Sequence, residues 1–170
     1  MKKNAFTLIE LLISVAILSL IMLFLYKSYA DLSKTNKLYE QEVSKLEYIS
    51  RIKQTLYLDL LLAKQKTLRV SHQDTKFDFV SFMTEHSLHR VIKPYIAYIV
   101  KENILYRVES NEEIKSVEIP RDQPYIIDKI GSVEKFKLYL PTDEEEEKIV
   151  IIEADFAKVA SVVLKTKVLN

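Results

Sequence analysis

The first 26 residues decide the architecture of this chain. They read Met1-Lys-Lys-Asn-Ala-Phe-Thr-Leu-Ile-Glu10, followed by Leu-Leu-Ile-Ser-Val-Ala-Ile-Leu-Ser-Leu-Ile-Met-Leu-Phe-Leu-Tyr26. From Phe6 to Tyr26, Glu10 is the only charged residue. A helix over this stretch would be about 31 Å long, which is one hydrocarbon thickness of a bilayer. Because basic residues are retained on the cytoplasmic side, the two N-terminal lysines predict a cytoplasmic N-terminus, with residues 27–170 on the opposite side.

Two features distinguish this stretch from an ordinary signal sequence. A carboxylate in an apolar run costs about 2.5 to 3.5 kcal/mol at a helix centre on insertion scales, and less near an end, so Glu10 needs a compensating interaction. A secretory signal peptide also needs small residues after its apolar core, whereas this core ends in the bulky Leu23-Phe-Leu-Tyr26. We therefore expect no cleavage after the apolar run.

The order of these residues resembles the N-terminal signature of type IV pilins and type II secretion pseudopilins. The resemblance rests on Lys2-Lys3, on Ala5 and on the run Phe6-Thr-Leu-Ile-Glu10-Leu-Leu-Ile. It implies that a prepilin peptidase cuts on the cytoplasmic side between Ala5 and Phe6 and methylates the new amino terminus of Phe6. It also implies that the Glu10 carboxylate pairs with the methylated amine of a neighbouring subunit during filament assembly. Such a pair would offset the cost of placing Glu10 in the span.

The chain departs from the family pattern at two places. Ala5 stands where glycine usually precedes the cut, and it is a small substitute. Many major pilins carry a proline further along the mature helix, where this chain has Tyr26-Lys-Ser-Tyr29. The missing proline favours a minor subunit.

Composition limits the remaining possibilities. The 170 residues are 48% hydrophobic and 29% charged, which is typical of one globular domain in addition to the membrane helix. With 25 basic and 24 acidic residues the chain is nearly neutral and shows no basic surface that indicates nucleic acid binding. The absence of cysteine excludes disulfides, thiolate metal sites and a cysteine nucleophile. Gly131 is the only glycine, which excludes the glycine-rich phosphate-binding loops.

The helix is predicted to continue beyond the membrane. Residues 27–66 contain neither glycine nor proline, and apolar residues recur there every three or four positions. This stripe consists of Leu46, Ile49, Ile52, Leu56, Leu60 and Ala63. We expect a sheet to pack on it. A two-stranded coiled coil is the alternative, although the stripe is short and Lys53 interrupts its seam.

The period changes at about Thr67, where β-branched and aromatic residues begin to alternate with polar ones. Strands are expected at 77–83, 95–100, 104–108, 114–119, 136–140, 148–152 and 161–169, with 95–100 and 104–108 joined as a hairpin by Lys101-Glu-Asn103. On the last strand, Val162, Leu164, Thr166 and Val168 share a face. No structure is predicted for residues 84–93.

The predicted fold class is α+β, a long N-terminal helix packed on a mainly antiparallel β-sheet. The expected divisions are a cytoplasmic leader peptide at 1–5, a transmembrane half-helix at 6–26, a periplasmic half-helix at 27–66 and a periplasmic β domain at 67–170. This plan is similar to that of pilins.

Three other groups of residues have a structural and a functional interpretation. His86 and His89 beside Glu85 have a spacing that suits metal ligands, but no third ligand is evident. The acidic run at residues 143–147 is interpreted as a solvated hairpin loop. Calcium binding is the alternative, but the run lacks the alternating spacing of acidic residues in a calcium-binding loop. Tyr26 and Tyr29 are expected in an interfacial aromatic belt. We assign no metal, cofactor or catalytic residue and expect no enzyme activity.

The resulting interpretation is a minor pilin or pseudopilin that is held in the inner membrane and assembles, helix against helix, into a periplasmic or surface filament. That filament is a type II secretion pseudopilus or a type IV pilus-like filament, with a competence filament included in the second group. The implied partners are prepilin peptidase, other pilin or pseudopilin subunits, the inner-membrane assembly platform and the lipid bilayer, without direct nucleic acid contact. The alternative from a different class is a single-pass membrane-anchored periplasmic ligand-sensing or scaffold protein. An intact Met1 in the mature protein would favour this alternative.

Overall fold

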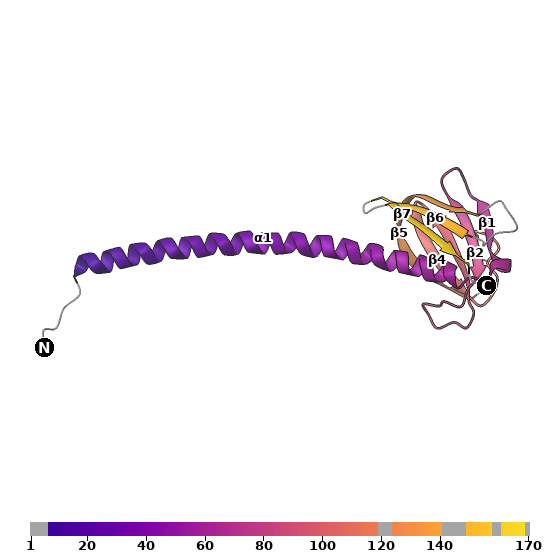
Figure 1. The fold of residues 1–170 in the computed structure, drawn as a ribbon, viewed down its shortest axis with the longest axis horizontal. Helices are drawn as coiled ribbons and strands as arrows, with labels where there is room; N and C mark the ends of the chain where they lie inside the picture. The colour runs from indigo at the N-terminus through magenta and orange to yellow at the C-terminus, as the bar shows by residue number, and fades with distance from the viewer. Residues whose placement is uncertain (1–6, 119–123, 141–148, 158–160, 169–170) are drawn as a thin grey trace. The chain divides into compact units, whose positions relative to one another are not determined.

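A computed structural model describes residues 7–118, 124–140, 149–157 and 161–168. The chain divides into two compact units, residues 1–46 and residues 47–170. One helix, α1 (Leu8–Leu61), extends through the first unit into the second (Figure 1). It is followed by a short 3₁₀ helix, η1 (Gln65–Thr67), and by strands β1 (Arg69–His72), β2 (Asp78–Met83), β3 (Tyr95–Lys101), β4 (Ile104–Ser110), β5 (Tyr125–Tyr139), β6 (Ile149–Phe156) and β7 (Ser161–Lys167).

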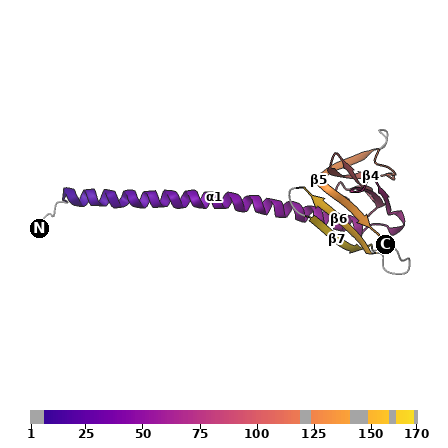
Figure 2. The same ribbon diagram turned by 90° about the horizontal axis from the view of Figure 1, so that it is seen from above.

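The seven strands form one antiparallel sheet in which every strand lies beside its neighbours in sequence, in the order β1 to β7. The long strand β5 pairs with β4 through its first half and with β6 through its second half. Figure 2 shows β5 passing from beside β4 to beside β6 and β7. The register shifts near Tyr106 and again between Val133 and Lys135, and such irregularities bend a sheet. The predicted α+β class is confirmed.

The last turns of α1 lie on the concave side of this curled sheet. Ile52, Leu56, Leu60 and Ala63 of the predicted stripe are buried and form the main core with inward-facing strand residues. Ile49 is partly buried against that core, whereas Leu46 is 66% exposed and does not contribute to it. The sheet, and not a second helix, therefore covers the stripe.

A second, smaller core lies on the opposite face of β2 to β4. It consists of Phe79, Ala97, Ile99, Val108 and Ile114. Successive residues of β3 alternate between the two cores, because neighbouring side chains of a strand point to opposite faces. The central strands are thus buried on both sides, which explains why residues 95–100 form a continuous apolar run.

The predicted hairpin is confirmed. Strands β3 and β4 pair from Tyr95 with Ser110 to Lys101 with Ile104. Glu102 and Asn103 have φ angles of 52° and 58°, the left-handed conformation that a two-residue hairpin turn requires. Asparagine tolerates this region, so the turn forms without glycine.

Two strand predictions need correction. Residues 114–118 form no strand: Ile114 is buried in the second core while residues 115–118 are exposed, and residue 119 lies outside the described part. The strand expected only at 136–140 is β5, which starts eleven residues earlier at Tyr125 and ends at Tyr139. Its first half was missed because Tyr125-Ile-Ile127 does not alternate and follows Pro124. Strand β1 was also missed.

The helix ends earlier than expected, at Leu61 and not at Lys66. Ala63 bridges to Thr84, and the amide of Lys64 donates to the carbonyl of Met83 at 2.7 Å. These bonds with the end of β2 replace the hydrogen bonds that a further helical turn would make.

Buried Asp78 closes the curl of the sheet between β2 and the second half of β5. Its carboxylate accepts hydrogen bonds from the amide of Leu138 at 3.1 Å and from Lys137 Nζ at 2.9 Å, and it contacts His72 Nδ1 at 2.6 Å. Burial raises the pKa of Asp78, but hydrogen bonds from His72, Lys137 and Leu138 outweigh it, so the net pKa lies below its ordinary value. The charged carboxylate therefore stabilises the fold.

We expect Asp78→Asn to lower the free energy of unfolding by about 1 to 3 kcal/mol at neutral pH, because it weakens several hydrogen bonds to a buried group. Since folding lowers the pKa of Asp78, the carboxylate contributes fully above its unfolded pKa, and the contribution is lost as the pH falls through the folded pKa. Urea unfolding of the purified full chain between pH 7 and pH 3 should show the difference from the parent shrinking on acidification. Glu153→Gln, in a partly exposed ion pair with Lys135, is the control and should have the smaller effect. An equal effect of the two substitutions would contradict the role of Asp78.

Candidate functional site

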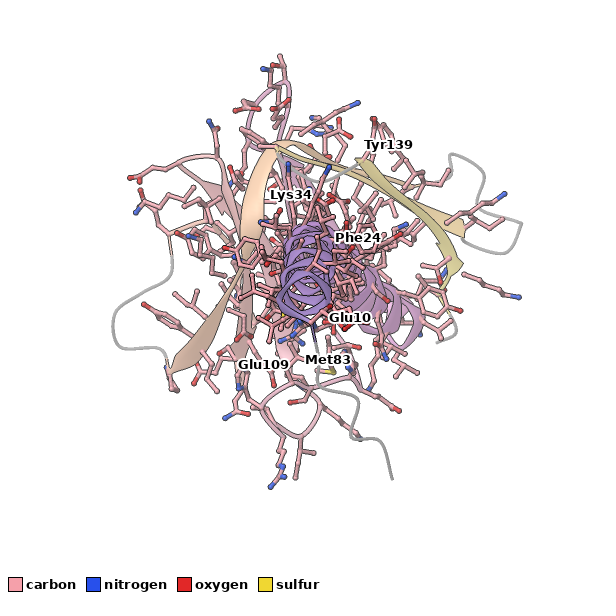
Figure 3. All side chains as sticks on the ribbon, turned by 90° about the vertical axis from the view of Figure 1, so that its left-hand side faces the viewer. Glu10, Phe24, Lys34, Met83, Glu109 and Tyr139 are labelled. Carbon is pink, nitrogen blue, oxygen red and sulfur yellow. The ribbon has the colours of Figure 1, made fainter. Side chains whose placement is uncertain are left out.

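The first turns of α1 carry apolar side chains around the whole helix. Between Leu8 and Leu25 the large apolar side chains are 50% to 80% exposed. Figure 3 labels Glu10 and Phe24 of this part of the helix. In the described part of the chain, α1 is the one helix long and apolar enough to cross a membrane. A helix that is apolar all round needs lipid or other helices around it. This surface is therefore a candidate for both membrane insertion and helix packing.

The polar groups within this stretch are satisfied by the helix itself. Ser14 Oγ donates to the carbonyl of Glu10, and Ser19 Oγ donates to the carbonyl of Val15, both at 2.8 Å. Such internal bonds remove the cost of placing hydroxyls in lipid. Glu10 is the one charged group of the described residues 7–26.

Glu10 also caps the helix. The amide and the hydroxyl of Thr7 both donate to Glu10 Oε2, at 2.9 Å and 2.8 Å, and the amide of Glu10 contacts Thr7 Oγ1 at 3.4 Å. This is a capping box, in which a threonine and a glutamate three residues later satisfy the free amides of the first turn. The Thr7-Leu-Ile-Glu10 spacing carries that signal, but the capping box was not predicted. Glu10 thus has a local role within one chain besides the intersubunit role implied by the resemblance.

The structure brings other predicted residues to different places. Ala5, Phe6 and the acidic run 143–147 lie outside the described residues. Tyr26 and Tyr29 are exposed on α1. His86 and His89 share no helix and bind different acids, Asp59 and Asp128. Among the described residues, no cluster of three metal-ligating side chains is present.

A buried charge cluster, which was not predicted, lies between α1 and the sheet. Its centre is the fully buried ion pair of Asp59 on α1 and Arg107 on β4. Arg107 Nε and Nη2 donate to the two carboxylate oxygens at 2.7 Å and 3.1 Å. The hydroxyl of Tyr98 donates to Asp59 Oδ2 at 2.6 Å, and His86 Nδ1 lies 2.5 Å from Asp59 Oδ1. Because the carboxylate only accepts, His86 Nδ1 carries the proton.

Glu109 extends the cluster along β4. Arg107 Nη1 donates to Glu109 Oε2 at 2.6 Å, and the same oxygen accepts from the amide of Leu88 at 3.2 Å. The hydroxyl of Ser87 donates to Glu109 Oε1. At the edge of the cluster, Asp128 on β5 lies 3.6 Å from Arg107 Nη1. We use the term buried charge cluster for Asp59, Arg107, Glu109 and Asp128 with Tyr98, His86 and His89.

The cluster keeps Arg107 and Glu109 charged. Burial lowers the pKa of Arg107, but the hydrogen bonds and the charge of Asp59 outweigh burial and raise that pKa above its ordinary value. Burial raises the pKa of Glu109, yet hydrogen bonds from Ser87 and Arg107 outweigh it and leave the pKa lowered. For Tyr98, burial and the charge of Asp59 both raise the pKa. Among the described residues, every buried side-chain nitrogen and oxygen has a hydrogen-bond partner. Arg107 occupies the space between the carboxylates, so the cluster is suited to structural support.

The alternation within β4 offered a signal for this cluster. Leu105, Arg107 and Glu109 are two residues apart, so a strand that points Leu105 into the core also points Arg107 and Glu109 inward. Asp59 likewise interrupts the apolar run Leu56-Tyr-Leu-Asp-Leu-Leu-Leu62. An acid on a buried helical stripe needs a cation opposite it.

Comparison with known proteins supports the interpretation of the N-terminus. Residues 1–26 match the family model described as the prokaryotic N-terminal methylation motif. This is the prepilin motif of type IV pilins and pseudopilins. Searches of curated proteins and of solved structures found no significant match.

Proposed function

We propose that this chain is a minor pilin or pseudopilin, a structural subunit of a type II secretion pseudopilus or of a type IV pilus-like filament. The match of residues 1–26 to the methylation motif carries the proposal. In this proposal, prepilin peptidase removes the leader peptide 1–5 and methylates Phe6. The inner-membrane assembly platform then incorporates the subunit into the filament, with its C-terminal unit in the periplasm.

The geometry of α1 supports the assembly role of Glu10. Both hydrogen bonds from Thr7 go to Oε2, and no described group donates to Oε1. The capping box therefore leaves an oxygen for the amine of Phe6 on an adjacent subunit. In a low-dielectric layer such an ion pair is strong, so it would fix the axial stagger of two otherwise uniform apolar helices.

Mass spectrometry of the membrane-extracted protein tests the proposal. We expect a mature chain that begins at N-methylated Phe6 in cells with an active prepilin peptidase, and an unprocessed chain in cells without it. Ala5→Gly is the matched variant and should be cut at least as completely, because it restores the usual residue before the cut. Recovery of intact Met1 in both strains would contradict the proposal and favour a single-pass ligand-sensing or scaffold protein.

A further inference from the structure

The buried charge cluster holds one loop, residues 84–93 between β2 and β3, which we call the clamped loop. His86 binds Asp59 of α1, and His89 Nε2 lies 2.9 Å from Asp128 Oδ2 of β5. Between them, the side chain of Ser87 and the amide of Leu88 bind Glu109 of β4. Three elements of the second unit thus fix four consecutive residues of the loop.

Backbone bonds complete this support. The amide of Glu85 donates to the carbonyl of Leu62, and the amide of Thr84 donates to the carbonyl of Pro94. The hydroxyl of Ser87 accepts from the amides of His89 and Val91, at 3.2 Å and 2.8 Å. The loop is therefore held in one conformation although it contains no regular secondary structure.

The end of the loop has an unfavourable backbone. Arg90 and Lys93 have φ angles of 61° and 52°, in the left-handed region that residues other than glycine rarely adopt. In the β3–β4 hairpin the two-residue turn requires this conformation, whereas the longer loop between β2 and β3 contains no such tight turn. Such conformations persist only where surrounding contacts impose them, and they concentrate at functional sites.

The loop presents an apolar side chain between two cations. Ile92 is 87% exposed, the highest exposure of any large apolar side chain in the described part of the second unit, and Leu88 is 45% exposed. Arg90 and Lys93 flank Ile92, are exposed, and form no ion pair with any described residue. The two acids that bind the middle of the loop, Glu109 and Asp128, pair with Arg107 and His89 and not with Arg90 or Lys93. The exposed end of the loop is thus apolar and positively charged.

We propose that the clamped loop is a docking element for another protein, whose surface offers an apolar patch for Ile92 flanked by carboxylates for Arg90 and Lys93. Charge complementarity selects the carboxylates, and the exposed isoleucine selects the apolar patch. A preorganised loop loses little conformational entropy on binding. By fixing the loop, the buried charge cluster would therefore favour docking in addition to stabilising the fold. Binding to an anionic lipid surface is disfavoured because it typically needs clusters of about 4 to 8 basic residues.

Site-specific photocrosslinking in cells tests this inference on the full chain. A photoreactive amino acid at position 92 should crosslink to one protein, and peptide mapping should place the adduct in an apolar segment that contains carboxylates. The same probe at Val163, which is 62% exposed on β7, is the positional control and should not capture that segment. An adduct with lipid alone, capture of the same segment from both positions, or no adduct at all would overturn the inference.

Charge reversal provides the second part of the experiment. Arg90→Glu with Lys93→Glu should lower the crosslinking yield from position 92 at least about tenfold, since like charges across an interface cost several kcal/mol. Lys101→Glu with Lys129→Glu makes the same change of net charge at two other exposed lysines and should leave the yield unchanged. Equal yields from the two variants would overturn the inference. Analysis of the N-terminus in the same cells reports separately on the proposed function, because processing at Phe6 does not depend on the loop.

Discussion

Replacement of Arg107 by methionine is expected to lower the free energy of unfolding by about 3 to 5 kcal/mol, which is the effect of removing one partner from a buried ion pair. Methionine fills much of the volume of arginine but donates no hydrogen bond. The fully buried Asp59 and the nearly fully buried Glu109 would then lose their cation. This is the largest stability effect that we expect from a single substitution in this chain.

Urea unfolding of the purified full chain would measure this effect, with Arg69→Met as the matched control. Arg69 pairs with Glu113 at 3.0 Å, but its side chain is 65% exposed, so we expect a loss of about 1 kcal/mol or less. Combining Arg107→Met with Asp59→Leu and Glu109→Gln should recover part of the stability, because it removes the buried charges that Arg107→Met alone leaves unpaired. Similar losses for Arg107→Met and Arg69→Met would contradict the buried charge cluster.

Replacement of Glu10 by leucine is expected to abolish incorporation into filaments while expression, membrane insertion and cleavage stay near normal. Insertion should survive because removing a carboxylate from an apolar span makes the span easier to insert. Filament incorporation should fail because the ion pair that fixes the stagger of adjacent helices is lost. Glu10→Asp, which is one methylene shorter, should be intermediate. Shearing of filaments from cells with equal expression of each variant would measure incorporation.

The capping box makes a sharper comparison possible. Glutamine can occupy the glutamate position of a capping box, so Glu10→Gln keeps the helix cap and removes only the charge. Thr7→Ala does the reverse, because it removes the capping hydroxyl and keeps the carboxylate. If the intersubunit ion pair matters, Glu10→Gln should fail to assemble and Thr7→Ala should assemble. The opposite result would assign Glu10 to helix capping alone.

Much of the fold could be predicted because its main signals are local. The apolar run from Phe6 to Tyr26, in which Glu10 is the only charge, predicts the helix. The spacing of Ile52, Leu56 and Leu60 predicts the face on which the sheet packs. The β3–β4 hairpin was predictable because Asn103 tolerates the left-handed conformation of its turn. Strand β5 was harder, because its two halves face different neighbours and Tyr125-Ile-Ile127 exposes consecutive apolar residues.

The candidate sites also differ in whether a local sequence signal predicts them. Glu10 stands out because it is the only charge in a span, which is visible in the sequence alone. The buried charge cluster joins residues that are far apart, such as Asp59 and Arg107, and periodicity shows that each points inward but not that they meet. The clamped loop was unpredictable because its shape depends on Asp59, Glu109 and Asp128 of three other elements.

The order of the strands has a consequence for how the chain folds. Since each strand lies beside the one before it, every pairing in the sheet closes only the segment between two consecutive strands. Folds rich in contacts between nearby residues fold fast, and here each hairpin can form as soon as its second strand is available. Other hydrogen bonds span longer distances along the chain, among them Asp59 with Arg107 at 48 residues, Asp78 with Leu138 at 60 residues and Tyr48 with Ile130 at 82 residues. During synthesis the N-terminus emerges first, so we expect the strands to pair in the order of the sequence. The hydrogen bond from the amide of Leu138 to Asp78 should form late and complete the curl of the sheet.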